Sequence, residues 1–100
     1  MIKHIVLWKL KDHAEGENRE RNLERMQALL EALPGLIPEI KVFEVGRALE
    51  PSPTTYDLAL YSEFASREGL QRYIDHPEHQ KVVQYVRAIT DQRAAMDYEL

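Results

Sequence analysis

The sequence of 100 residues contains no cysteine and no long apolar run. The absence of cysteine excludes a disulfide framework and a thiolate metal site. A membrane-spanning helix needs about 20 consecutive apolar residues, which no part of the chain offers. Basic residues are also in the minority, and the formal net charge is −4. This charge argues against nucleic acid as a partner, because such binding rests on clustered lysine and arginine.

The first residues also lack the apolar core and the cleavage site of a secretory signal peptide. We therefore expect a soluble, cytoplasmic protein without a membrane partner. The length is typical of one domain, so we expect residues 1–100 to form a single domain.

Two kinds of hydrophobic periodicity alternate along the chain. Apolar residues at every second position predict strands, and apolar residues three and four apart predict helices. The predicted strands cover residues 2–10, 40–48, 56–64 and 94–100, and the predicted helices cover residues 18–33, 66–75 and 77–90. We interpret residues 11–16, which include His13, as a polar loop. This split βαβ order predicts an α+β, ferredoxin-like fold, with a four-stranded antiparallel sheet and helices on one face.

Both faces of the first strand are apolar at its centre. His4, Val6 and Trp8 form one row of side chains, and Ile5 and Leu7 lie on the other. Since the helices cover one face of the sheet, the second face would remain an exposed apolar patch, which soluble monomers rarely tolerate. We therefore expect a homodimer in which the two sheets pack against each other through this face.

The stretch from Tyr73 to His79 holds a tyrosine and two of the four histidines. Pro77 suits the first position of a helix and biases His76 toward extended backbone, so one helix ends here and another begins. His79 then shares a face with the valines of the following turns and points inward. The helix dipole favours its neutral ring, which can accept a proton near pH 7. A hydrogen-bonded core histidine is the alternative interpretation.

The chain resembles the stress-responsive A/B barrel (Dabb) family in several segments. They are residues 3–7 (KHIVL), 56–60 (YDLAL), 73–79 (YIDHPEH) and the late MDY at 96–98. The resemblance covers essentially the whole chain and implies a dimeric α/β barrel with a pocket between the sheet and the helices. The family includes a plant enzyme, olivetolic acid cyclase, which closes a linear tetraketide by aldol condensation without a metal or an organic cofactor.

The resemblance also implies roles for individual residues. His79 corresponds to the histidine base of the cyclase, Tyr73 to its supporting tyrosine, and His4 to its histidine on the first strand. Leu58 and Met26 stand where the cyclase has a further pocket histidine and a pocket tyrosine. We therefore expect a more apolar pocket and a different ligand.

Three classes of function remain. The first is a cofactor-independent enzyme of the cyclase or lyase type, with His79 as general base on a carbonyl, polyketide-like compound. The second is a non-catalytic protein, associated with stress or with the binding of a small apolar or carbonyl ligand. The third is a metal or haem protein, suggested by His76 and His79 beside Asp75 and Glu78. We rank it last because the proline places His76 at a helix junction, and we expect no cofactor and no metal site.

Overall fold

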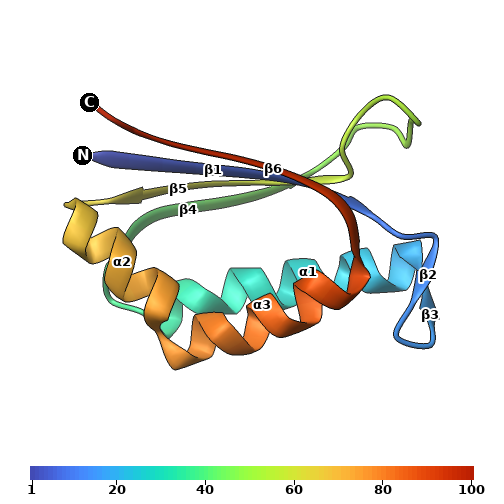
Figure 1. Ribbon diagram of the computed structural model, residues 1–100, viewed down its shortest axis with the longest axis horizontal. Helices are drawn as coiled ribbons and strands as arrows, with labels where there is room; N and C mark the ends of the chain where they lie inside the picture. The colour runs from blue at the N-terminus through green and yellow to red at the C-terminus, as the bar shows by residue number, and fades with distance from the viewer.

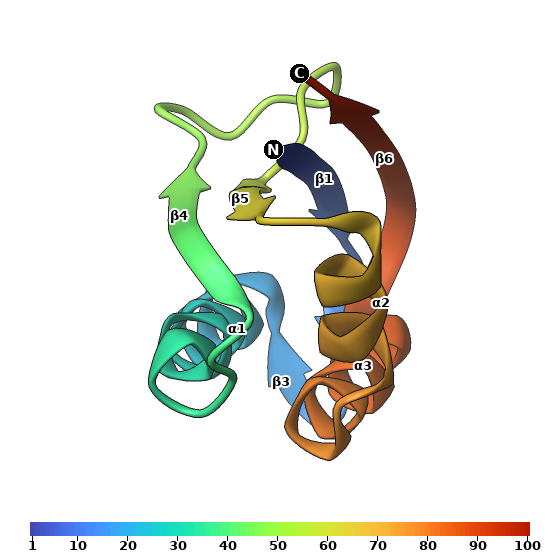
Figure 2. The ribbon, with the colours of Figure 1, turned by 90° about the vertical axis from the view of Figure 1, so that its left-hand side faces the viewer.

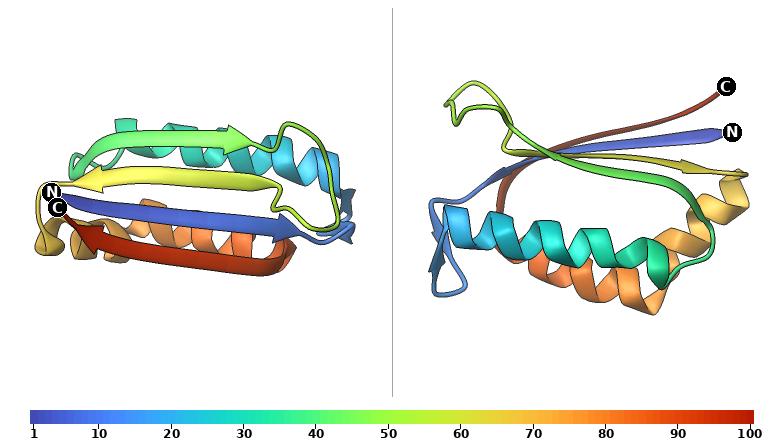
Figure 3. Two further views of the ribbon diagram at one scale, coloured as in Figure 1. Left: turned by 90° about the horizontal axis from the view of Figure 1, so that it is seen from above. Right: turned by 180° about the vertical axis from the view of Figure 1, so that it is seen from behind.

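The computed structural model describes residues 1–100 and contains a four-stranded sheet with all of its helices on one face (Figure 1). The strands of this sheet are β1 (Ile2–Leu10), β4 (Ile40–Arg47), β5 (Leu58–Phe64) and β6 (Thr90–Glu99). Their order is β4-β5-β1-β6, and each neighbouring pair is antiparallel (Figure 3). The predicted ferredoxin-like α+β fold is therefore confirmed.

The helices are α1 (Arg19–Ala32), α2 (Arg67–Asp75) and α3 (Pro77–Ile89), and a short 3₁₀ turn, η1 (Leu33–Gly35), follows α1. Figure 2 shows α1 on the β4 side of the sheet and α2 and α3 on the β6 side. Asn18 caps α1 by accepting a hydrogen bond from the amide of Arg21 at 2.9 Å. None of the helices is long and apolar enough to span a membrane.

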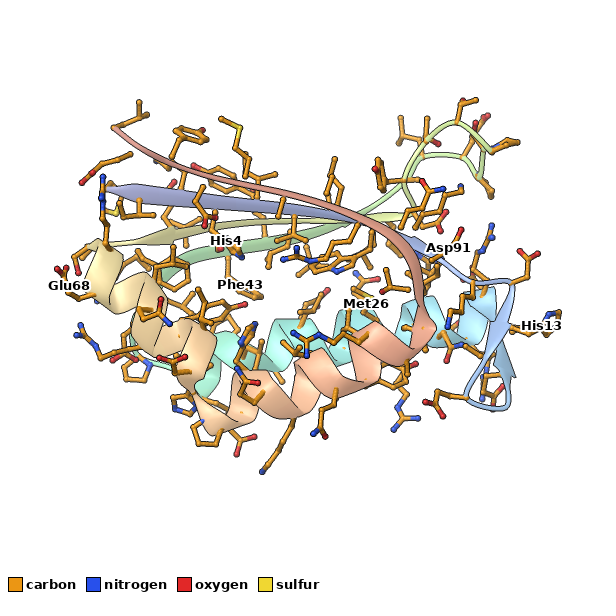
Figure 4. The ribbon with its side chains drawn as sticks, viewed as in Figure 1. His4, His13, Met26, Phe43, Glu68 and Asp91 are labelled. Atoms are coloured by element: carbon orange, nitrogen blue, oxygen red, sulfur yellow. The ribbon has the colours of Figure 1, made fainter.

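The side chains of β1 and β5 alternate between the two faces as their sequence pattern predicts. His4, Val6 and Trp8 are buried against the helices, whereas Ile5 and Leu7 are half-buried on the opposite face. Figure 4 shows His4 and Phe43 pointing from the sheet toward the helices. The apolar core fills the layer between the sheet and the helices.

The prediction of a polar loop at residues 11–16 was wrong at His13 and Ala14, which form a short strand. Residues 11–18 contain a small hairpin of β2 (His13–Ala14) and β3 (Glu17–Asn18). Its two-residue turn places Glu15 at φ 52° and Gly16 at φ 75°, and such turns require positive φ at both positions. Glutamate is not a usual residue there, which explains why the pattern gave no hairpin signal. His13 is exposed at the far end of the molecule, as expected for a solvated residue (Figure 4).

Two strand boundaries also differ from the prediction. β6 begins at Thr90, directly after α3, rather than at residue 94. This first part of β6 is polar and exposed, so it carries no apolar alternation that would mark it as a strand. β5 begins at Leu58 rather than at residue 56. The carboxylate of Asp57, just before this strand, accepts a hydrogen bond from the amide of Leu10 at 2.8 Å.

Candidate functional site

A cavity of about 580 Å³ lies between the sheet and the helices α2 and α3. This volume is in the range of small-molecule sites. Its polar side chains come from both layers, namely from β1, β6, α2 and α3. The apolar wall includes Val6, Trp8, Leu60, Val82, Val83 and Val86.

The helical side of the site is built around the break between α2 and α3. In a continuous helix the amide of Glu78 would donate to the carbonyl of Ile74. Here that amide donates to Nδ1 of His76 at 3.1 Å, and Pro77 has no amide hydrogen to donate. The carbonyl oxygen of Ile74 is therefore left free of its intrahelical partner.

This free carbonyl determines the protonation of His79. Nδ1 of His79 lies 3.0 Å from the carbonyl oxygen of Ile74. Because a carbonyl oxygen only accepts, Nδ1 carries the proton and donates it. In the neutral ring Nε2 is then unprotonated. Nε2 has no hydrogen-bond partner within the chain, and the ring of His79 lines the cavity.

The surroundings of His79 favour this neutral form. Burial lowers the pKa of His79 below its ordinary value, and the hydrogen bond to Ile74 opposes this effect only in part. The ring is therefore neutral at pH 7, with a free nitrogen that can accept a proton.

Tyr73 lies directly beside His79, with 4.2 Å between the ring centroids. The tyrosine is 1% exposed, and its hydroxyl has no hydrogen-bond partner in the chain. Burial raises the pKa of Tyr73 well above its usual value, so the hydroxyl keeps its proton. A buried hydroxyl without a partner costs stability.

The sheet side of the site is a pair of residues from β1 and β6. His4 and Asp97 face each other across the two strands, and Nδ1 of His4 lies 2.5 Å from Oδ1 of Asp97. The carboxylate accepts from Nδ1, which orients the imidazole of His4. The His4 ring meets Tyr73 edge-on, with 6.2 Å between the centroids. The structure thus brings Tyr73, His79 and His4 to one cavity.

Other residues that the sequence singled out lie elsewhere. Leu58 and Met26 are 2% and 0% exposed in the packed core, and neither lines the cavity. The expectation that they make the pocket more apolar was therefore wrong, because their side chains are used for packing between sheet and helix. No three residues of the types that bind metals gather at one place, and Nδ1 of His76 already accepts from Glu78.

Sequence reasoning missed three charged residues of the cavity, which are Asp97, Arg87 and Arg93. Asp97 was noted only as part of the family resemblance, without its bond to His4. The available signal was the period of two along β6, which places residues 93, 95 and 97 on the same face.

The comparisons with known proteins agree with this architecture. Residues 2–100 match the family model of the Stress Responsive A/B Barrel Domain. The chain belongs to this family. This A/B barrel protein is 36% identical, over 80 residues, to an uncharacterized protein of Streptomyces coelicolor, with 80% of each chain covered.

Two solved structures share the fold. A dimeric protein of unknown function with a ferredoxin-like fold, from Bacteroides fragilis, is similar with a TM-score of 0.80 and 37% identity. The match covers 99% of this chain and 95% of that one. The hydroxynitrile lyase of Passiflora edulis has a TM-score of 0.82 at 18% identity, with 97% and 90% of the two chains covered. That identity shows a common fold alone.

The lowered pKa of His79 predicts how stability depends on pH. Unfolded histidine titrates at about pH 6.5, so below that pH the unfolded chain binds more protons at this position than the folded chain. The free energy of unfolding should therefore decrease as the pH falls from about 6.5 toward the lowered pKa. Urea unfolding at several pH values measures this loss. It should be smaller in His79→Gln, which cannot titrate, and unchanged in His13→Gln. Equal losses in His79→Gln and the wild type would contradict the prediction.

Proposed function

We propose that this A/B barrel protein is a cofactor-independent enzyme of the cyclase or lyase type that acts on a small, partly apolar carbonyl compound. The observation that carries the proposal is the free Nε2 of His79, which the carbonyl of Ile74 holds in the basic form. The ring of Tyr73, whose hydroxyl is protonated and unpartnered, lies beside the ring of this base. A base and a donor at the same end of a cavity are what proton abstraction next to a carbonyl requires.

The chemistry follows from these two groups. Nε2 of His79 takes a proton from the carbon next to the ligand carbonyl, and the electron pair left behind forms an enolate. The hydroxyl of Tyr73 donates a hydrogen bond to the enolate oxygen. In the cyclase form of the reaction, the enolate carbon attacks a second carbonyl of the same molecule and forms a carbon–carbon bond. The His79 imidazolium then returns its proton to the new alkoxide oxygen.

The remaining parts of the cavity support this chemistry. His4, oriented by Asp97, lines the same cavity and offers a second polar contact. The apolar walls hold the body of the ligand and keep water away, which strengthens the hydrogen bond from Tyr73. The lyase from Passiflora edulis supports the proposal only in showing that this fold can carry catalysis.

A homodimer through the outer face of the sheet completes the proposal. We define the outer face as the side of the sheet turned away from the helices. Leu7 lies at its centre, between Ala59 of β5 and Ala94 of β6. Met96 is 63% exposed there, beside Ile5. The Bacteroides fragilis relative is dimeric, which supports a dimer for this chain as well.

The catalytic roles are tested by deuterium exchange. We expect the protein to exchange the hydrogens next to the carbonyl of phenylacetone in D₂O faster than free imidazole at equal concentration. His79→Ala should lower the enzymatic rate by about 10²- to 10⁴-fold, because a general base contributes that much. Tyr73→Phe should lower the rate without lowering the melting temperature, because the hydroxyl that it removes has no partner in the chain. Proton NMR follows the exchange.

Two outcomes separate the alternatives. If the His79→Ala variant has the melting temperature and the exchange rate of the wild type, His79 is a structural residue. Phenylacetone could bind in the cavity while its hydrogens exchange no faster than with free imidazole. That result would favour the non-catalytic, ligand-binding protein instead. His13→Ala is the matched control, because that histidine lies in the β2–β3 hairpin, and its rate should equal that of the wild type.

The dimer is tested at the centre of the outer face. Leu7→Glu would bury an unpaired carboxylate between the two sheets, which is strongly unfavourable. We expect sedimentation velocity to show a dimer for the wild type and a monomer or an aggregate for Leu7→Glu. Leu36→Glu, at an exposed position after η1, should remain dimeric. A monomeric wild type, or an intact Leu7→Glu dimer, would contradict this assembly.

A further inference from the structure

The arginines of the chain divide into those with a partner and those without one. The guanidinium of Arg25 lies over the ring of Tyr85, 4.5 Å from its centroid. Arg87 and Arg93 form no ion pair and no hydrogen bond through their side chains, and both line the cavity. The arginines that form ion pairs with carboxylates are Arg19, Arg21, Arg47, Arg67 and Arg72.

Arg87 and Arg93 are unpaired although the chain is acidic. The chain carries 17 acidic and 13 basic residues, so carboxylates are plentiful for an arginine on the surface. The cavity lining contains a single acidic residue, Asp97, and its carboxylate already accepts from His4. The lining therefore carries two arginines that form no ion pair with a carboxylate.

The two arginines lie at the opening of the cavity. Arg87 belongs to the last turn of α3, and Arg93 lies near the start of β6, the edge strand that follows directly. Both residues are exposed although they line the cavity, whereas Tyr73 and His4 are buried within it. Arg93 pairs with Trp8 across the strands, so its side chain lies on the inner face of the sheet. The positive charge of Arg93 also contributes to the lowered pKa of His79, in the same direction as burial.

We propose that Arg87 and Arg93 form an anion-binding end of the cavity, and that its ligand is a small amphipathic carboxylate. The apolar body of the ligand lies along the valines and Trp8, and its carboxylate remains at the opening. The planar guanidinium matches a carboxylate through two parallel hydrogen bonds, which a neutral group cannot reproduce. The inference rests on the proposed function, because it assigns a substrate class, a keto acid or related carboxylate, to the same cavity.

Two probes of equal shape test this assignment. They are 4-phenylbutanoate, which carries a carboxylate, and 4-phenylbutanamide, which is neutral. We expect the wild-type protein to bind the carboxylate about 10- to 100-fold more tightly, as charge-assisted hydrogen bonds from two arginines predict. Titrations followed by ¹H–¹⁵N NMR give both dissociation constants and show whether the shifted signals belong to the cavity.

The variants separate the arginine pair from the general charge of the protein. The double variant Arg87→Gln/Arg93→Gln should bind both probes equally. Its affinity for the amide should equal that of the wild type. This double variant should fold normally, because neither side chain has a partner within the chain. Arg67→Gln combined with Arg72→Gln removes the same charge from α2, outside the cavity, and should keep the full preference.

Three results would overturn the proposal. They are equal binding of the two probes by the wild type, no binding of the carboxylate at millimolar concentration, and a preference that persists in the Arg87→Gln/Arg93→Gln variant. His79→Ala should keep the preference for the carboxylate, because His79 is not part of the arginine pair. The anion-binding end and the general base can therefore fail separately.

Discussion

The carbonyl oxygen of Ile74 is the acceptor on which the site depends. Pro77 interrupts the helical register, and His76 takes the amide of Glu78 that would otherwise bond this oxygen. The oxygen then accepts from Nδ1 of His79 at 3.0 Å and from the side chain of Gln80 at 2.6 Å. One local break in a helix thus fixes the tautomer of a histidine whose ring lines a cavity.

The opposite wall of the cavity depends on strand register rather than on a helix break. Pairing of β1 with β6 places His4 opposite Asp97, although 93 residues separate them in the sequence. Tyr73 lies between the two walls, with its ring in contact with His79 and edge-on to His4. The lack of a partner for its hydroxyl destabilises the folded protein without a ligand by about 1–3 kcal/mol.

The parts of this arrangement that local patterns encode could be predicted from the sequence. Alternation along β1 and β5 identified the buried rows, and Pro77 identified the helix break and the inward face of His79. The parts that depend on pairing between distant segments could not. The first residues of β6 are polar because an edge strand is exposed, so the start of this strand had no local signal. The period of two places Arg93 and Asp97 on one face, but their approach to Trp8 and His4 depends on pairing with β1. The family resemblance placed Leu58 and Met26 in the pocket, but only the packing of the whole core shows that they lie outside it.

The central claim is that His79 is neutral at pH 7, with its proton on Nδ1 and a free Nε2. Long-range ¹H–¹⁵N NMR of the histidine rings tests this claim most directly, because protonated and unprotonated ring nitrogens have clearly different ¹⁵N shifts. The account predicts a protonated Nδ1 and an unprotonated Nε2 for His79, identified by the loss of these signals in His79→Gln. A proton on Nε2, either in the other neutral tautomer or in the imidazolium, would contradict it.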